Sequence, residues 1–161
     1  MGKKGTCALL ARQNSANIVC LLVSGCPVGW AASKLSCYYI MSPAYTTMRD
    51  AWQKCQGMNA NLPIINSAEE NTFIGDLLKR QGTKRTWIGL RRNTSDSKFY
   101  WLDGTPIEGN YDSWKSEEPN NNNDNENCAL IVVDPSHPVW NDIPCEESWA
   151  ATLCQKDMQE D

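Results

Sequence analysis

The chain has 161 residues, a formal net charge of -4 at pH 7 and eight cysteines. This length suits a single domain with one sizeable core. Phosphate binding needs clustered Lys and Arg, and the sequence shows no such stripe, which argues against a nucleic-acid partner. No run of about eighteen apolar residues is present, which argues against a membrane span. So many cysteines in a short chain favour an oxidising compartment, and we expect a secreted, extracellular protein.

The N-terminal segment is basic and then apolar. Three basic residues and no acidic one accompany an apolar stretch at residues 18–23, which ends in a Ser-Gly pair. A basic start, an apolar centre and small residues at a cleavage point are typical of a signal peptide, so we predict that residues 1–25 are removed. A retained N-terminal extension that keeps Cys7 and Cys20 is the alternative.

Two segments have the periodicity of amphipathic helices. In the first, apolar residues from Met48 to Cys55 fall at i, i+3, i+4 and i+7, one of the two preceding threonines caps the start, and Gly57 ends the helix. The second begins at the capping box Ser67-Ala68-Glu69-Glu70 and runs to about Arg80. Its apolar face, which we expect to be core, consists of Phe73, Ile74, Leu77 and Leu78.

Apolar and β-branched runs predict strands, and residues 26–39 predict a short hairpin. Between residues 103 and 127 little regular structure is expected, and a loop of this length inside a compact domain is usually functional. The predicted strands are residues 87–90, 99–102, 128–133, 139–140 and 151–155.

That loop holds the polar run on which the functional prediction depends. Glu118-Pro119-Asn120 leads through residues 121–125 into Glu126, and Trp140-Asn141-Asp142 follows downstream. Calcium takes about six to eight oxygen ligands from carboxylates, amides and carbonyls, which these side chains can supply. Zinc would need His or Cys, but the chain has one histidine and no C-x-x-C spacing. A cis bond before Pro119 would turn the two flanking side chains toward one side of the loop.

These motifs resemble the C-type lectin-like domain family in its mannose-type, calcium-dependent, long form. The resemblance rests on Glu-Pro-Asn, a Glu eight positions after the first Glu, a Cys two further on, then Trp-Asn-Asp and a Cys, together with the core motif Trp87-Ile88-Gly89-Leu90. It covers residues 26–156, the expected lectin domain, and leaves residues 157–161 as a C-terminal tail.

The resemblance implies an α+β fold in which two helices flank small antiparallel sheets, with a long calcium-binding loop and disulfide staples. Six cysteines allow about fifteen connectivities, and spacing alone does not choose among them. The family pattern implies that the pairs are Cys26 with Cys37, Cys55 with Cys154, and Cys128 with Cys145.

In the family, a bound calcium ion also coordinates two neighbouring sugar hydroxyls, and its ligands hydrogen-bond the same hydroxyls. The Glu-Pro-Asn order resembles the type that favours mannose, N-acetylglucosamine and fucose, whereas galactose-type members have Gln-Pro-Asp. We therefore expect a calcium-dependent lectin for mannose-type glycans on cell surfaces or microbes, compatible with innate immunity, symbiont recognition or venom action. The residues implied to bind both calcium and sugar are Glu118, Asn120, Glu126, Asn141 and Asp142.

Many relatives have an auxiliary calcium site. The positions that would build it hold Arg92, Asp96, Asn121 and Asn127 beside Glu126. Arg in place of a carboxylate, and amides in place of acids, argue against a second ion, so we expect one calcium. Because the carboxylates of the site repel one another without a cation, removing calcium is expected to abolish sugar binding and to loosen residues 118–127.

Other functions fit parts of the sequence. A flexible solvated loop is the alternative on composition alone. A lectin-like module that binds a protein ligand or ice without sugar is the second alternative, but such relatives usually lose one or more of the five ligands. Paired acids such as Glu117 and Glu118 can serve an enzyme, yet adjacent acids in a loop are far more often ligands or surface, so we predict no catalysis.

Two further features concern modification and assembly. Asn93-Thr94-Ser95 is an N-glycosylation sequon in a loop. The sequence has no collagen or heptad repeat, so a surface dimer, an interchain disulfide through Cys7 or Cys20 and a monomer all stay open. Because one shallow sugar site binds weakly, we expect a small homo-oligomer.

Overall fold

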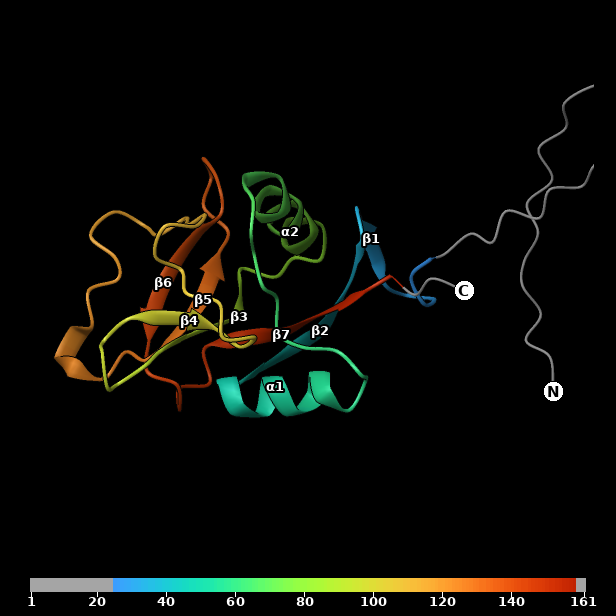
Figure 1. The fold of residues 1–161 in the computed structure, drawn as a ribbon. Coiled ribbons are helices and arrows are strands. Elements are labelled where there is room, and N and C mark those ends of the chain that lie inside the picture. The colour runs from blue at the N-terminus through green and yellow to red at the C-terminus, as the bar shows by residue number, and fades with distance from the viewer. Residues whose placement is uncertain (1–24, 159–161) are drawn as a thin grey trace, which may run out of the picture.

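The computed structural model describes residues 25–158, so the predicted signal peptide with Cys7 and Cys20 lies outside the described residues. Two helices lie on either side of an extended sheet (Figure 1). The last strand ends one residue after the predicted domain limit. The elements are β1 (Ala31–Ser33), β2 (Ser36–Thr46), α1 (Met48–Gln56), α2 (Ala68–Arg80), β3 (Arg85–Arg92), β4 (Phe99–Trp101), β5 (Cys128–Val132), β6 (Val139–Ile143) and β7 (Ala150–Asp157).

The central strands bury both of their faces. Alternate residues of a strand point to opposite faces. Ile88 and Leu90 of β3 belong to the core that α2 closes, whereas Trp87 belongs to the core that α1 closes. β5 repeats this alternation with Ile131 on the α2 side and Leu130 on the α1 side. Burial on both faces explains why these strands are continuous apolar runs in the sequence.

Both helix starts follow the predicted capping pattern. The Thr47 side chain accepts the backbone N–H of Asp50 at 3.2 Å, and the Ser67 hydroxyl accepts that of Glu70 at 3.2 Å. The Glu70 carboxylate accepts the N–H of Asn66 at 3.0 Å instead of the N–H of the cap residue itself. The capping box of α2 is therefore present, with its return hydrogen bond displaced by one residue.

The strands form one connected sheet in the order β1-β2-β7-β3-β5-β6, with β4 pairing β3 outside this path. The predicted α+β fold, in which two helices flank small antiparallel sheets, is confirmed, and one pairing goes beyond it, because β3 and β7 run parallel with Thr86 opposite Ala151. The buried Thr86 hydroxyl donates to the Ala151 carbonyl at 2.8 Å. This contact joins two antiparallel parts into a single mixed sheet.

The described residues contain the three disulfides that the resemblance implies. The longest, between Cys55 and Cys154, spans 99 residues and ties α1 to β7. In the chain-entropy model such a link stabilises the fold by about 4–5 kcal/mol. The link between Cys128 and Cys145 joins the start of β5 to the segment after β6. The third pair is Cys26 with Cys37.

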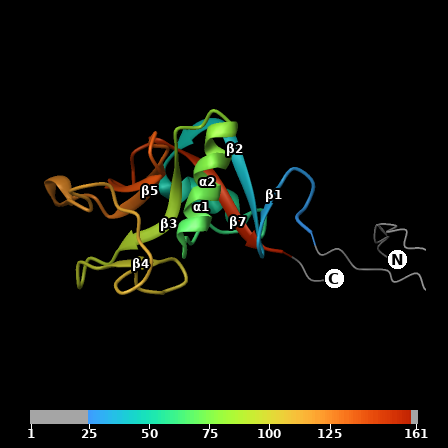
Figure 2. The ribbon, with the colours of Figure 1, turned by 90° about the horizontal axis from the view of Figure 1, so that it is seen from above.

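The long loop between β4 and β5 is fastened to β6 near its middle. The Lys115 N–H donates to the Trp140 carbonyl at 2.9 Å, and the Trp140 N–H donates to the Ser113 carbonyl at 2.7 Å. Beyond this point the loop contains the short 3-10 turn η1 (Asn122–Asp124). In Figure 1 η1 lies at the far left, and the two ends of the described chain lie at the right. Figure 2 shows the same loop from above. None of the described helices has the length and apolar character needed to span a bilayer.

Asn71 of α2 fixes the start of β6 and the middle of the long loop. Its side chain donates to the Pro138 carbonyl at 2.7 Å and to the Ser113 hydroxyl at 3.2 Å, and it accepts the Trp140 indole N–H at 2.8 Å. Asn71 is only 2% exposed and Trp140 is fully buried, so the indole N–H would have no partner if the amide were removed. Asn71 stands three residues before Ile74 on the apolar face of the helix. A polar residue on this face is the one signal in the sequence that indicates a buried hydrogen-bonding role for Asn71.

We expect Asn71→Ala to lower the free energy of unfolding by about 1–3 kcal/mol, because the buried Trp140 indole N–H loses its partner, while the Pro138 carbonyl keeps the Ser113 hydroxyl. Urea denaturation followed by tryptophan fluorescence measures this. The matched control is Thr72→Ala on the same helix, which removes an exposed hydroxyl bonded to the Ala68 carbonyl and should change stability by about 0.5 kcal/mol or less. Equal losses in the two variants would contradict the anchoring role of Asn71.

Candidate calcium and ligand site

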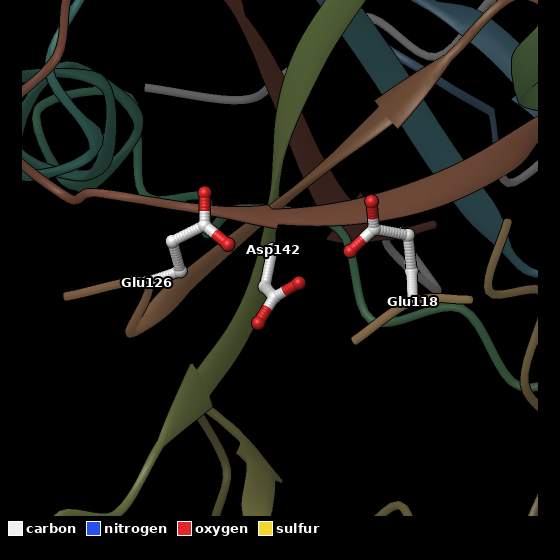
Figure 3. Close-up of side chains that lie close together, drawn as sticks. All are labelled: Glu118, Glu126 and Asp142. Carbon is white, nitrogen blue, oxygen red and sulfur yellow. The ribbon is translucent and has the colours of Figure 1, made fainter. Parts of the chain in front are cut away.

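Three of the predicted ligands converge although they lie on separate segments. Glu118 lies in the loop after β4, Glu126 precedes β5, and Asp142 lies within β6. One carboxylate oxygen from each lies within 4.8 Å of the others. Figure 3 shows Asp142 between the two glutamates, with carboxylate oxygens turned toward the middle of the group. An ion bound at about 2.4 Å by two oxygens holds them at most about 4.8 Å apart, so the three oxygens fit one calcium ion.

The two predicted amide ligands lie beside these carboxylates in the chain. Asn120 follows Pro119 in the loop, and its side-chain oxygen accepts the backbone N–H of Asn122 at 2.8 Å. Asn141 directly precedes Asp142 in β6 and is half-buried. Their roles as ligands stay predictions.

The backbone of the loop accounts for its unusual composition. Asn121, Asn123 and Asp124 all have left-handed conformations, with φ of 48°, 55° and 53°. Asn and Asp adopt this region more readily than other residues with a side chain, so the polar run suits the turn geometry as well as ligand chemistry. The bond between Glu118 and Pro119 is cis, as the sequence permits.

Asp142 connects the loop to the sheet. Its side chain is fully buried, and its carboxylate accepts the backbone N–H groups of Asn120 at 3.0 Å and Asn121 at 2.9 Å. It also accepts Nη2 of Arg92 at 2.6 Å. The sequence prediction placed Arg92 at an auxiliary-site position but missed this ion pair, because the two residues are 50 positions apart and lie on different strands.

Burial and the proximity of the three carboxylates raise the pKa values of the two glutamates. Burial, followed by the hydrogen bond and charge of Asp142, raises the pKa of Glu118 to about 7. Burial also raises the pKa of Glu126, although the Asn122 N–H that it accepts at 2.8 Å acts in the opposite direction. Near pH 7 the Glu118 carboxyl is therefore about half protonated without calcium, and a cation must displace this proton.

Two other predicted positions lie outside the carboxylate group. The Asp96 carboxylate accepts the Lys98 N–H at 3.0 Å and the Tyr100 hydroxyl at 2.8 Å, so these contacts occupy it in the turn after β3. Among residues 25–158, the cluster of acidic, His or Cys ligand atoms consists of the three carboxylates alone. The sequon residue Asn93 is exposed in the same turn, which leaves its glycosylation a prediction.

Comparison with known proteins gives the family. Residues 45–156 match the model described as the lectin C-type domain. The chain belongs to the C-type lectin domain family. The human protein named C-type lectin domain family 4 member D is 31% identical to it over 130 residues, which are 81% of this chain and 58% of that relative. The chain thus spans little more than half of the relative's length.

Solved structures confirm the fold of this C-type lectin domain. The C-type lectin domain of murine dendritic cell inhibitory receptor 2, solved in complex with N-glycan, is 30% identical with a TM-score of 0.73, and the match covers 83% of this chain and 99% of that one. A calcium-independent type II antifreeze protein is 28% identical with a TM-score of 0.71, covering 84% and 96%. These names describe a receptor lectin domain and an antifreeze protein, not enzymes.

We expect the calcium affinity of this C-type lectin domain to fall as the pH drops below about 7, by up to roughly tenfold per pH unit. The raised pKa of Glu118 means that the calcium-free protein holds a proton below about pH 7 and loses it above, so calcium binding at lower pH must release that proton. Calorimetric calcium titrations at about pH 6 and about pH 8 measure the difference. Glu117→Gln, an exposed neighbour, should keep the dependence, and a pH-independent affinity would contradict it.

Proposed function

We propose that this C-type lectin domain binds mannose-type glycans through one calcium ion that bridges protein and sugar. The convergence of Glu118, Glu126 and Asp142 within 4.8 Å carries the proposal. Three separate segments bring carboxylates together at a cost in repulsion that a divalent cation removes. The fold shared with a lectin domain solved in complex with N-glycan supports a carbohydrate as the ligand.

The side chains of this site would divide the recognition of a sugar between acceptors and donors. Bound calcium supplies an oxygen-preferring centre with coordination positions left for two sugar hydroxyls. Glu118 and Glu126 offer carboxylate oxygens as acceptors, and Asn120 and Asn141 offer amide N–H groups as donors. Each hydroxyl donates to a carboxylate and accepts from an amide, so two neighbouring hydroxyls satisfy the four side chains.

The preference for mannose-type sugars depends on which end of the Glu-Pro-Asn motif accepts and which end donates. Glu118 accepts and Asn120 donates, and the Gln-Pro-Asp motif of galactose-type members reverses this order. The reversed order suits a differently oriented hydroxyl pair. The residues of this chain therefore favour the equatorial 3- and 4-hydroxyls of mannose, N-acetylglucosamine and glucose, and a comparable pair in fucose.

A second candidate function is the binding of a protein ligand or ice without sugar. The similarity to a calcium-independent antifreeze protein favours it, because the same fold is compatible with that role. All five predicted ligands are present in this chain, and the three acidic ones converge. For this reason calcium-dependent sugar binding is the function that we propose.

The setting of the domain forms part of the proposal. Three disulfides among the described residues suit a secreted protein in an oxidising environment. The ligands would be glycans on microbial or host surfaces. A single shallow site binds weakly, so we propose that a small oligomer raises the avidity.

The purified protein should be captured by immobilised mannan in the presence of calcium and released by a chelator, while immobilised galactose captures little. Pull-down or surface plasmon resonance on the two matrices measures this. Asp142→Asn should lose capture because the buried charge of the site is removed, whereas Glu117→Gln should retain it. Capture on mannan that survives the chelator would refute the bridging role of calcium.

The double variant Glu118→Gln with Asn120→Asp exchanges acceptor and donor at the two ends of the motif. We expect it to lose about tenfold or more in affinity for mannan, because each misplaced polar group costs on the order of 1–3 kcal/mol, and to gain capture on galactose. A calcium titration of the variant verifies that the ion still binds. Unchanged preference with calcium bound would show that the motif does not set specificity here.

A further inference from the structure

Arg92, at the end of β3, places a positive charge against the carboxylate group. Its side chain is 11% exposed and that of Asp142 is 0% exposed, with Nη2 and Oδ2 2.6 Å apart. The other Lys or Arg ion pairs within residues 25–158, which link Lys34 to Glu69 and Lys98 to Glu108, are more than half exposed on both sides. Solvent screens exposed pairs strongly and buried ones weakly, so the Arg92 charge acts on the site at nearly full strength.

The guanidinium of Arg92 is fixed by contacts on several sides. Nε donates to the Glu126 carbonyl at 3.2 Å, and Nη1 donates to the Ser97 carbonyl at 3.3 Å. The central carbon lies 4.4 Å from the centre of the Phe99 ring. Three nitrogens thus serve three partners in a planar fork, a geometry that the single ammonium of Lys does not reproduce.

These contacts reach the loop through Asp142. The carboxylate that pairs with Arg92 also accepts the N–H groups of Asn120 and Asn121, the residues that follow the cis proline bond. The backbone N–H of Arg92 donates to the Asn127 carbonyl at 2.9 Å, at the other end of the loop. Arg92 therefore contacts one end of residues 120–127 directly and orients the other end through Asp142, and none of these contacts requires a metal ion.

The charges of the site follow a simple count. Glu118, Glu126 and Asp142 carry three formal negative charges when ionised, and Arg92 carries one positive charge, which leaves -2 (-3 + 1). One calcium ion balances this remainder. Without calcium, Arg92 offsets part of the repulsion that would otherwise drive the carboxylates and the loop apart.

We propose that Arg92 is a positioning residue that acts as a permanent cation of the site: it holds Asp142 and residues 120–121 in the calcium-binding arrangement whether or not calcium is present. This proposal rests on the proposed function only in taking calcium as the metal ion that the site binds. The sequence analysis expects all of residues 118–127 to loosen when calcium is removed. According to this proposal, Asn120 and Asn121 stay bonded to Asp142, and only the rest of the segment loosens.

The test is amide hydrogen exchange at Asn120 and Asn121, measured by NMR in the presence of a chelator. Arg92→Met keeps an apolar chain over Phe99 but removes the charge and the fork. In chelator we expect these two amides to exchange about 10- to 100-fold faster in the variant than in the unmodified protein, the range set by one charge-assisted hydrogen bond. Saturating calcium should restore slow exchange, because the ion then holds Asp142.

Two variants separate this role from a general loss of stability. Lys98→Met removes the same charge from an exposed pair with Glu108, also 2.6 Å long, and should leave the exchange of Asn120 and Asn121 unchanged. Arg92→Lys keeps the charge without the fork and should give an intermediate rate. Amides of the buried strand β5 should stay protected in all of these variants.

The proposal is overturned if the unmodified protein exchanges as fast as Arg92→Met in chelator, or if Arg92→Met exchanges as slowly as the unmodified protein. Faster exchange throughout β5, in calcium as well as in chelator, would overturn it in favour of a purely structural role for Arg92. The comparison in chelator uses neither sugar nor bound calcium, so failure of mannan capture would refute the proposed function without affecting this result.

Discussion

The buried carboxylate of Asp142 is the constraint on which the arrangement of the site depends. A charge without access to water is costly unless it is paired and hydrogen-bonded. Asp142 meets this requirement with one guanidinium and two backbone N–H groups, which come from β3 and from the loop. Satisfying one side chain therefore draws three segments together, and the two glutamates complete a group with the size and charge of a calcium site.

The scaffold fixes Asp142 from the opposite side. Asn71 of α2 holds the residues that precede it through Pro138 and Trp140, and the disulfide at Cys128 ties the neighbouring strand to the end of β6. The parallel pairing of β3 with β7 adds the N-terminal part of the sheet to this frame. A rigid set of strands thus presents a loop with almost no regular structure of its own, as is common for binding sites.

Much of the fold and of the candidate site could be predicted from the sequence, and the features that could not be predicted share one physical reason. Periodicity and capping residues gave both helices, and the continuous apolar runs gave the central strands, because these signals are local. The resemblance implied the disulfides, which the structure contains, and the ligand set, of which the carboxylates converge. The sequence prediction missed the ion pair of Arg92 with Asp142, the anchoring by Asn71 and the parallel strand pairing. Each joins residues 42 or more positions apart, whose proximity depends on the path of the chain.

The two ends of the described chain lie side by side, away from the loop. Ser36 of β2 pairs with Asp157 of β7, and the Met158 N–H donates to the Leu35 carbonyl at 2.7 Å. Figure 1 places these ends at the right of the molecule and η1 at the far left. A domain held through either end would turn its carboxylate group outward from the point of attachment. Surface tethers, fluorescent labels and fusion partners can therefore be joined there with open access to the loop, and the spacing of several such domains would depend on the joining segments.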